Sequence, residues 1–123
     1  MNELKAIMIA ELAFAAEAFI NRAIDADNVP KFERQSWPLQ AAEAKAWAAD
    51  KAAATPLLDQ IAASRGMDAA KLKAAALRKA LAYERLTAHV AGQRQALQAK
   101  IEAAKTQDAL DKIVIEFTHP EAA

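Results

Sequence analysis

The sequence predicts an all-α protein: a helical bundle or hairpin with one long C-terminal helix and a short extended C-terminal segment. Hydrophobic residues fill 54% of the 123 positions, but 35 of these residues are alanine, the strongest helix former. Only two glycines and four prolines interrupt the chain, and the larger apolar residues recur at spacings of three, four and seven. We therefore expect helices that approach closely around a thin core, in a chain long enough for one ordinary domain.

The first predicted helix spans residues 2–26, and it carries apolar residues on two sides. One broad face is apolar and is expected to line the core: Met8, Ile9, Leu12, Phe19, Ile20 and Ile24. The opposite, mixed face includes Leu4, Ile7 and Phe14, which a surface helix rarely exposes as a group. We expect these three residues to contact a partner or a second copy, and we treat residues 1–27 as a contact helix preceding a helical domain of residues 28–123.

The second predicted helix begins after an Asn28 cap, with Pro30 in its first turn, and runs to about Lys51. Pro38 falls inside this stretch, so the helix either kinks there or restarts with Ser36 as its cap. Trp37 and Trp47 stand among alanines and are expected to anchor contacts, because each buries more area than several alanines together.

Local signals mark the remaining elements. Thr55 followed by Pro56 predicts the start of a short helix that ends at Gly66, and Asp68 predicts the start of a long helix over 69–105. This long helix should carry an apolar seam formed by Leu72, Tyr83, Leu86, Val90, Leu97 and Ile101.

The chain closes with one last turn and an extended stretch. Thr106 predicts the start of a turn that continues through Asp111. The β-branched residues within 113–117 favour an extended segment, which must lie on the bundle or pair with a partner.

Charge is balanced overall, with 16 basic and 16 acidic residues, but it is distributed unevenly. Residues 65–105 hold nine Lys or Arg against three acids, and Lys71, Arg78 and Arg85 form a row at heptad spacing. We expect this row to be solvated or paired with acids such as Glu43 and Asp50, themselves expected on a solvated face. We keep Arg78 and Arg85 as candidate contact residues. The pI of about 6.7 and the lack of interleaved aromatic residues argue against nucleic acid as the main partner.

Catalytic and metal-binding patterns are absent from the sequence. There is no cysteine, the two histidines lie far apart, and no glycine-rich phosphate loop occurs. We expect no enzymatic activity, cofactor or metal. Glu11 and Glu17 interrupt the N-terminal apolar run, so we expect no membrane partner, no signal peptide and synthesis in the cytoplasm.

Residues 36–117 resemble a small helical domain of uncharacterised function that recurs in tail-fibre and tail-fibre-assembly proteins of tailed bacteriophages and prophages. The matching motifs are Ser36-Trp37-Pro38-x-Gln40-x-x-Glu43-Ala44, Thr55-Pro56-Leu57-Leu58-Asp59-x-x-Ala62, Arg65-Gly66, Gly92-Gln93-Arg94-Gln95-Ala96-Leu97, Ile101, Thr106, Leu110 and Ile113. The chain departs from this family at Trp47, where relatives have Tyr, and at Ala88 and Gly92, where they have a small glycine-containing pair. Relatives are also usually longer.

The resemblance implies a role at a phage tail. Combined with the apolar contact residues, it predicts a non-enzymatic tail-fibre-associated protein that acts as an assembly chaperone or tip cap, present in the host cytoplasm during assembly. We expect it to bind a fibre or other tail protein and to form a homo-oligomer. The alternatives are a structural virion component that links the fibre to the baseplate or tail, and, third, a nucleic-acid-associated regulator.

Overall fold

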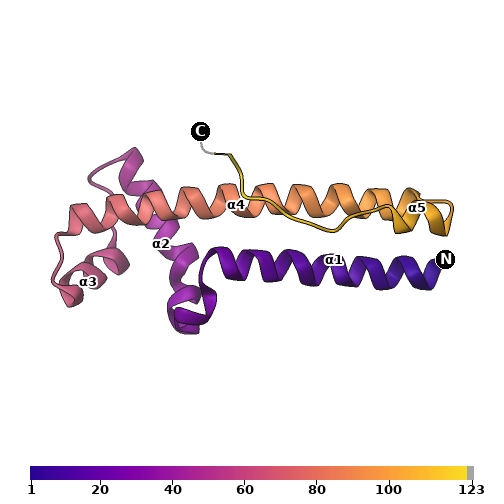
Figure 1. The fold of residues 1–123 in the computed structure, drawn as a ribbon. Helices are drawn as coiled ribbons and strands as arrows, with labels where there is room; N and C mark the ends of the chain where they lie inside the picture. Colours follow the sequence, from indigo (N-terminus) through magenta and orange to yellow (C-terminus); the bar gives the residue numbers. More distant parts are fainter. Residues whose placement is uncertain (122–123) are drawn as a thin grey trace. The chain divides into compact units, whose positions relative to one another are not determined.

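The computed structural model describes residues 1–121, and within them every regular element is a helix (Figure 1). The all-α prediction is therefore confirmed, including the long helix towards the C-terminus. The elements, in chain order, are α1 (Asn2–Ala23), the 3₁₀ turn η1 (Ala26–Asn28), α2 (Lys31–Ala49), α3 (Pro56–Arg65), α4 (Ala69–Ala103) and α5 (Gln107–Asp111).

The contacts divide the chain into two compact units, which we describe separately. Among the described residues, the first unit contains Met1–Ala26 together with residues 85–121, and the second contains Asp27–Glu84. In this division the second half of α4, α5 and the extended segment up to residue 121 group with the N-terminal helix α1.

In the first unit, α1 packs antiparallel to the second half of α4. Leu12 is fully buried with Ile101 and Leu110, and Ala16 is buried with Leu86 and Val90. The expected core face of α1 is confirmed, because its remaining members pack against these two clusters: Met8, Ile9, Phe19, Ile20 and Ile24. Leu4 was expected on the outer face, but it also packs against the core.

The segment after α5 is extended and lies on the first unit, along α4 (Figure 1). Ile113, Ile115 and Phe117 pack against the core, whereas Val114 between them is 64% exposed. This alternation is that of an extended chain with one apolar side. Of the two possibilities that the sequence left open, packing on the bundle is the one observed.

The connection between α1 and α2 differs from the prediction. α1 ends at Ala23, Asp25 adopts a left-handed backbone with φ of 55°, and η1 follows with Ala26 buried. Asn28 belongs to this turn and does not cap α2, which begins at Lys31 directly after Pro30. The predicted cap was wrong because tertiary burial of Ala26 places the turn where the sequence pattern showed only a break.

In the second unit, α2 continues through Pro38 as one helix. Ser36 does not cap a new helix, because its hydroxyl donates to the Glu33 carbonyl at 2.6 Å, within the same helix. Glu43 and Ala44 are buried further along α2, and the Glu43 carboxylate bonds to the first turn of α3. The α2 helix therefore persists on both sides of Pro38, although the proline has no N–H and the helix lacks one backbone hydrogen bond there.

The start of α3 is capped from a different helix. The Leu57 N–H donates to Glu43 Oε2 at 3.1 Å, and the Leu58 N–H donates to Glu43 Oε1 at 3.0 Å. Thr55 was expected to cap this helix with its hydroxyl, but that hydroxyl donates to Asp59 Oδ1 at 3.1 Å. Glu43 was expected in solvent, yet it is only 8% exposed. The bonds from the Glu43 carboxylate to the start of α3 therefore correct both the expected Thr55 cap and the expected exposure of Glu43.

The boundary between α3 and α4 follows the prediction. Gly66 adopts a left-handed conformation with φ of 74°, and the N–H groups of Gly66 and Met67 bond back to Ala63 and Ala62, which is a Schellman motif. The Asp68 carboxylate then accepts the Lys71 N–H at 3.1 Å and caps α4.

Most of the predicted α4 seam is confirmed. Leu72, Leu86, Val90 and Ile101 are buried and Leu97 is half-buried, but Tyr83 is 38% exposed. The predicted cap of α5 is also confirmed, because the Thr106 hydroxyl accepts the Ala109 N–H at 3.1 Å.

Candidate functional site

The outer face of α1 carries two large apolar side chains in solvent. Ile7 is 55% exposed and Phe14 is 77% exposed, and they lie one heptad apart on the side opposite the buried Leu12. Of the three residues predicted on this face, Leu4 is the exception, because it belongs to the core.

We define the α1 outer row as the exposed residues that continue this face at spacings of three and four: Glu3, Ile7, Ala10, Phe14 and Glu17. Apolar side chains occupy the middle of the row, and a carboxylate stands at each end. No lysine or arginine belongs to the row, so it is an acidic and apolar surface.

A second exposed face lies on α2 in the other unit. Phe32 is 72% exposed and Leu39 is 56% exposed, again one heptad apart. We define the α2 outer row as the exposed residues at spacings of three and four along this face: Phe32, Gln35, Leu39, Ala42, Ala46 and Ala49. Phe32 and Leu39 were not predicted to form a contact surface. Their heptad spacing, continued by Ala46, was the signal that could have revealed it.

The two tryptophans of α2 are half-buried within the second unit rather than fully displayed. The rings of Trp37 and Tyr83 meet edge to face, with centroids 5.9 Å apart. The Trp47 ring lies beneath Lys51 Nζ, which is 3.5 Å from its centroid, and Lys73 Nζ is 5.9 Å away. Both rings thus contribute to packing between α2 and its neighbours.

Lys73 also pairs with Asp59 of α3, with its Nζ 3.0 Å from Asp59 Oδ1. This hydrogen bond lowers the pKa of Asp59 below its usual value of 3.8; partial desolvation opposes the shift, whereas the Thr55 hydroxyl and the charge of Lys73 add to it. The cluster joins α3 to α4, and its chemistry is that of a structural ion pair.

The basic row of α4 is open to solvent. Lys71, Arg78 and Arg85 are all exposed, and none of their side chains forms an ion pair with any residue of 1–121. The acids expected to pair with them are engaged elsewhere, because Glu43 caps α3 and Asp50 Oδ1 accepts the Ala52 N–H at 3.0 Å. Lys71 and Arg78 lie in the second unit, and Arg85 is the first residue of the first unit's part of α4.

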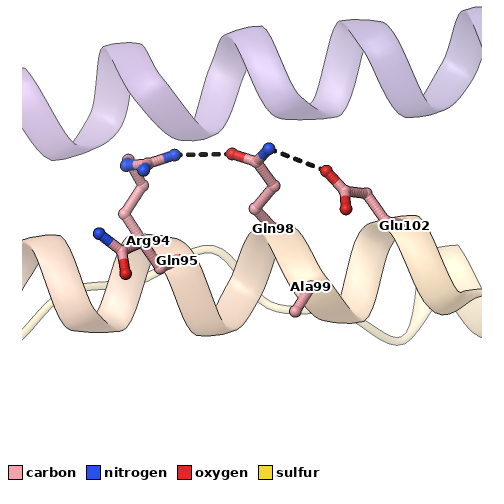
Figure 2. Close-up of a pocket in the computed structure, with 5 residues that line it drawn as sticks. All are labelled: Arg94, Gln95, Gln98, Ala99 and Glu102. Atoms are coloured by element: carbon pink, nitrogen blue, oxygen red, sulfur yellow. Dashed lines mark hydrogen bonds between the residues drawn. The ribbon is translucent and has the colours of Figure 1, made fainter.

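Two shallow cavities lie in the first unit. One, of about 180 Å³, is lined by Arg94, Gln95, Gln98, Ala99 and Glu102 of α4. Figure 2 shows three of these side chains linked on the side of α4 that faces α1: Arg94 donates to Gln98 Oε1 at 2.6 Å, and Gln98 donates to Glu102 Oε1 at 2.8 Å. The Lys5 ammonium adds a bond from α1 to the Glu102 carbonyl at 2.8 Å.

The second cavity, of about 330 Å³, lies between α4 and the extended C-terminal segment. Its lining includes Gln93 and Thr118, which hold the segment in place: the Thr118 N–H donates to Gln93 Oε1 at 3.2 Å, and Gln93 Nε2 donates to Thr118 Oγ1 at 2.8 Å. His89 Nε2 lies 3.1 Å from the same hydroxyl, and the His119 ring lies 4.9 Å from the Phe19 ring. Both histidines therefore take part in packing of this segment.

Neither cavity lining contains a histidine, a serine or a cysteine. Among residues 1–121, no three His, Cys, Asp or Glu side chains gather closely enough to hold a metal ion. We take the two outer rows and the basic row, all exposed, as candidate functional surfaces of the described residues.

Comparison with known proteins adds one similarity. Residues 78–116 match the family model described as the HI1402 helical domain. The match covers the chain from Arg78 on α4 to Glu116 in the extended segment, so it includes α5 and its Thr106 cap. No curated protein and no solved structure matched the chain.

Across residues 1–121, no helix combines the length and apolar character needed to cross a membrane.

Proposed function

We propose that the chain is a non-enzymatic assembly protein that binds a phage tail-fibre protein through the α2 outer row. The observation that carries the binding role is the exposure of Phe32 and Leu39 one heptad apart on a helix whose opposite side is anchored in the protein. Two large apolar side chains on one exposed helix face are typical of a helix that docks on another protein.

The partner class comes from the sequence resemblance of residues 36–117 to the tail-fibre-associated domain. Small assembly factors of this kind bind the fibre and help it to fold, and an exposed apolar helix face is suited to covering apolar fibre surface before assembly is complete. The alanines that continue the row, Ala42, Ala46 and Ala49, allow a partner helix to approach closely.

Co-expression with a phage tail-fibre protein from the same source tests the proposal. We expect the fibre protein to be soluble only with this chain and to co-purify with it. The double variant Phe32→Asp with Leu39→Asp should abolish co-purification, because it places two charges in the contact. Val114→Asp is the control for placing a carboxylate at an exposed apolar position, since Val114 is 64% exposed but lies on the C-terminal segment. A soluble fibre without this chain, and no co-purification, would contradict the chaperone role.

Retention in the particle separates the chaperone from a structural component of the tail. Mass spectrometry of purified virions should find the chain scarce or missing if it acts only during assembly in the host cytoplasm. Stoichiometric copies in the virion would instead favour the structural role.

A further inference from the structure

The second unit carries a counterpart to the α1 outer row. We define the α4 outer row as Lys71, Ala74, Arg78 and Leu81, which follow one another at spacings of three and four along the face of α4 opposite the buried Leu72. Lys71 and Arg78 are exposed, Leu81 is 50% exposed and Ala74 is half-buried. This row is basic and apolar, whereas the α1 outer row is acidic and apolar.

We propose that the α1 outer row of one copy of this chain packs antiparallel on the α4 outer row of a second copy. In this register Glu17 faces Lys71, Phe14 faces Ala74, Ala10 faces Arg78 and Ile7 faces Leu81. Each layer pairs a residue at heptad position a of one helix with a residue at position d of the other, which is the usual layer of an antiparallel helix pair. The inference goes beyond the proposed function, because it requires no fibre protein and uses a different face from the α2 outer row.

The match between the two rows is chemical as well as geometric. The layer of Glu17 and Lys71 joins opposite charges, and the layer of Ile7 and Leu81 joins two exposed aliphatic side chains. The largest exposed side chain of α1, Phe14, meets the small Ala74, and the long Arg78 meets the small Ala10. Large side chains therefore face small ones in both central layers, which allows the helices to approach closely.

Pairing of the α1 outer row with itself fits much less well. In a parallel pair each glutamate would face its own copy, and like charges at such positions repel. In an antiparallel pair, the layer arrangement places Glu3 or Glu17 against Ile7 or Phe14. The charges thus select the α4 outer row, not a second α1, as the complementary surface.

Because the two rows differ, the contact is head-to-tail: the copy that contributes its α1 outer row keeps a free α4 outer row, and its partner keeps a free α1 outer row. Each paired row spans eleven residues, about 15 Å from its first Cα to its last. An interface of this length belongs to the small, weak class, below about 1,200 Å² of total buried area. We expect association to appear as the concentration rises and to weaken as salt is added.

A charge-exchange experiment tests the pairing. Sedimentation velocity of the full chain is measured from about 10 to about 500 µM, a range that suits a weak interface. We expect the weight-average sedimentation coefficient to rise with concentration. Glu17→Lys alone and Lys71→Glu alone should each weaken association about 10- to 100-fold, since each juxtaposes like charges. An equimolar mixture of the two variants should associate again, because each then supplies the charge that the other lacks.

Two further variants make the result specific. Glu33→Lys makes the same charge change on α2 and should leave association unchanged, since Glu33 lies outside both rows. Phe14→Ser should weaken association without loss of helix content, because a side chain that is 77% exposed contributes little to the protein's own core. A protein that stays monomeric throughout the range, association insensitive to both charge reversals, or a mixture that fails to recover would overturn the proposal.

Discussion

Glu43→Ala removes the contact by which α2 caps α3. Both carboxylate oxygens accept backbone N–H groups, from Leu57 at 3.1 Å and Leu58 at 3.0 Å. Without the carboxylate, these amides lose their acceptor at the first turn of a helix, where no carbonyl of the same helix can replace it. Leu58 is fully buried, so water has little access to its N–H.

The size of the effect follows from two lost bonds. A helix cap contributes about 0.5–2 kcal/mol, and a hydrogen bond to a charged group about 1.5–3 kcal/mol. Bonds to a single carboxylate are not independent, so we expect Glu43→Ala to lower the free energy of unfolding by about 2–4 kcal/mol. At about 4 °C per kcal/mol, the melting temperature should fall by about 8–16 °C.

Urea denaturation followed by tryptophan fluorescence is the appropriate assay, because Trp37 and Trp47 both lie on α2, in the same unit as Glu43. Glu43→Gln keeps one acceptor oxygen and should lose about half as much free energy. Glu33→Ala is the control, since Glu33 is an exposed glutamate on the same helix. A loss below about 0.5 kcal/mol for Glu43→Ala, the size expected of an ordinary surface change, would refute the capping argument.

The two glycines should respond in opposite directions to alanine. Gly66→Ala should lower the free energy of unfolding by about 1 kcal/mol, because the left-handed φ of 74° strains any side chain. Gly92→Ala should raise it by about 0.5–1 kcal/mol, because a methyl group at this helical position meets open space. Thermal unfolding of both variants checks the two signs. Leu110→Ala should cost about 2–5 kcal/mol in urea unfolding, since this residue is fully buried with the α1 core, and a cost below about 1 kcal/mol would exclude α5 from that core. The Lys73 ion pair lowers the folded pKa of Asp59 relative to the unfolded chain, so its contribution is complete above the usual pKa of 3.8 and is lost as the pH falls through the lower folded value. Urea midpoints between about pH 5 and about pH 2.5 should therefore fall more for the wild type than for Asp59→Asn, and equal slopes would contradict the assignment.

Much of the fold was predictable because its signals are local. Gly66, Asp68 and Thr106 end or begin helices through bonds that reach only three to five residues along the chain. A sequence shows both partners of such bonds side by side. The inward face of α1 was equally predictable, because the helical period alone brings its apolar residues together.

The errors concern residues whose partners are distant. Glu43 was placed in solvent because its neighbours on α2 offer it nothing, whereas its two donors lie 14 and 15 residues further along the chain. Leu4 was placed outside because the faces of an isolated helix have no fixed edge, and only the packing partners of α1 decide where the core ends. The path of α2 through Pro38 could not be chosen from the sequence either, since a proline permits both a kinked helix and a break.

The candidate surfaces were predictable in part. Ile7 and Phe14 were identified from the apolar character of a second helix face, and the structure places both in solvent. Phe32 and Leu39 were missed because the sequence does not distinguish an exposed apolar residue from a buried one. Only the packing of the rest of α2 shows which of its faces remains in solvent. Their role in binding, like that of the basic row, is a prediction that the variants above will test.

By itself the sequence determined that this protein is helical, where its long helix begins and which side of α1 turns inward, because alanine content, local caps and the helical period act within a few residues. The tertiary structure decided that Glu43 joins two helices, that the C-terminal segment covers the first unit's core, and which apolar side chains remain in solvent. These outcomes depend on which surfaces meet, and burial is a property of two surfaces rather than of one helix.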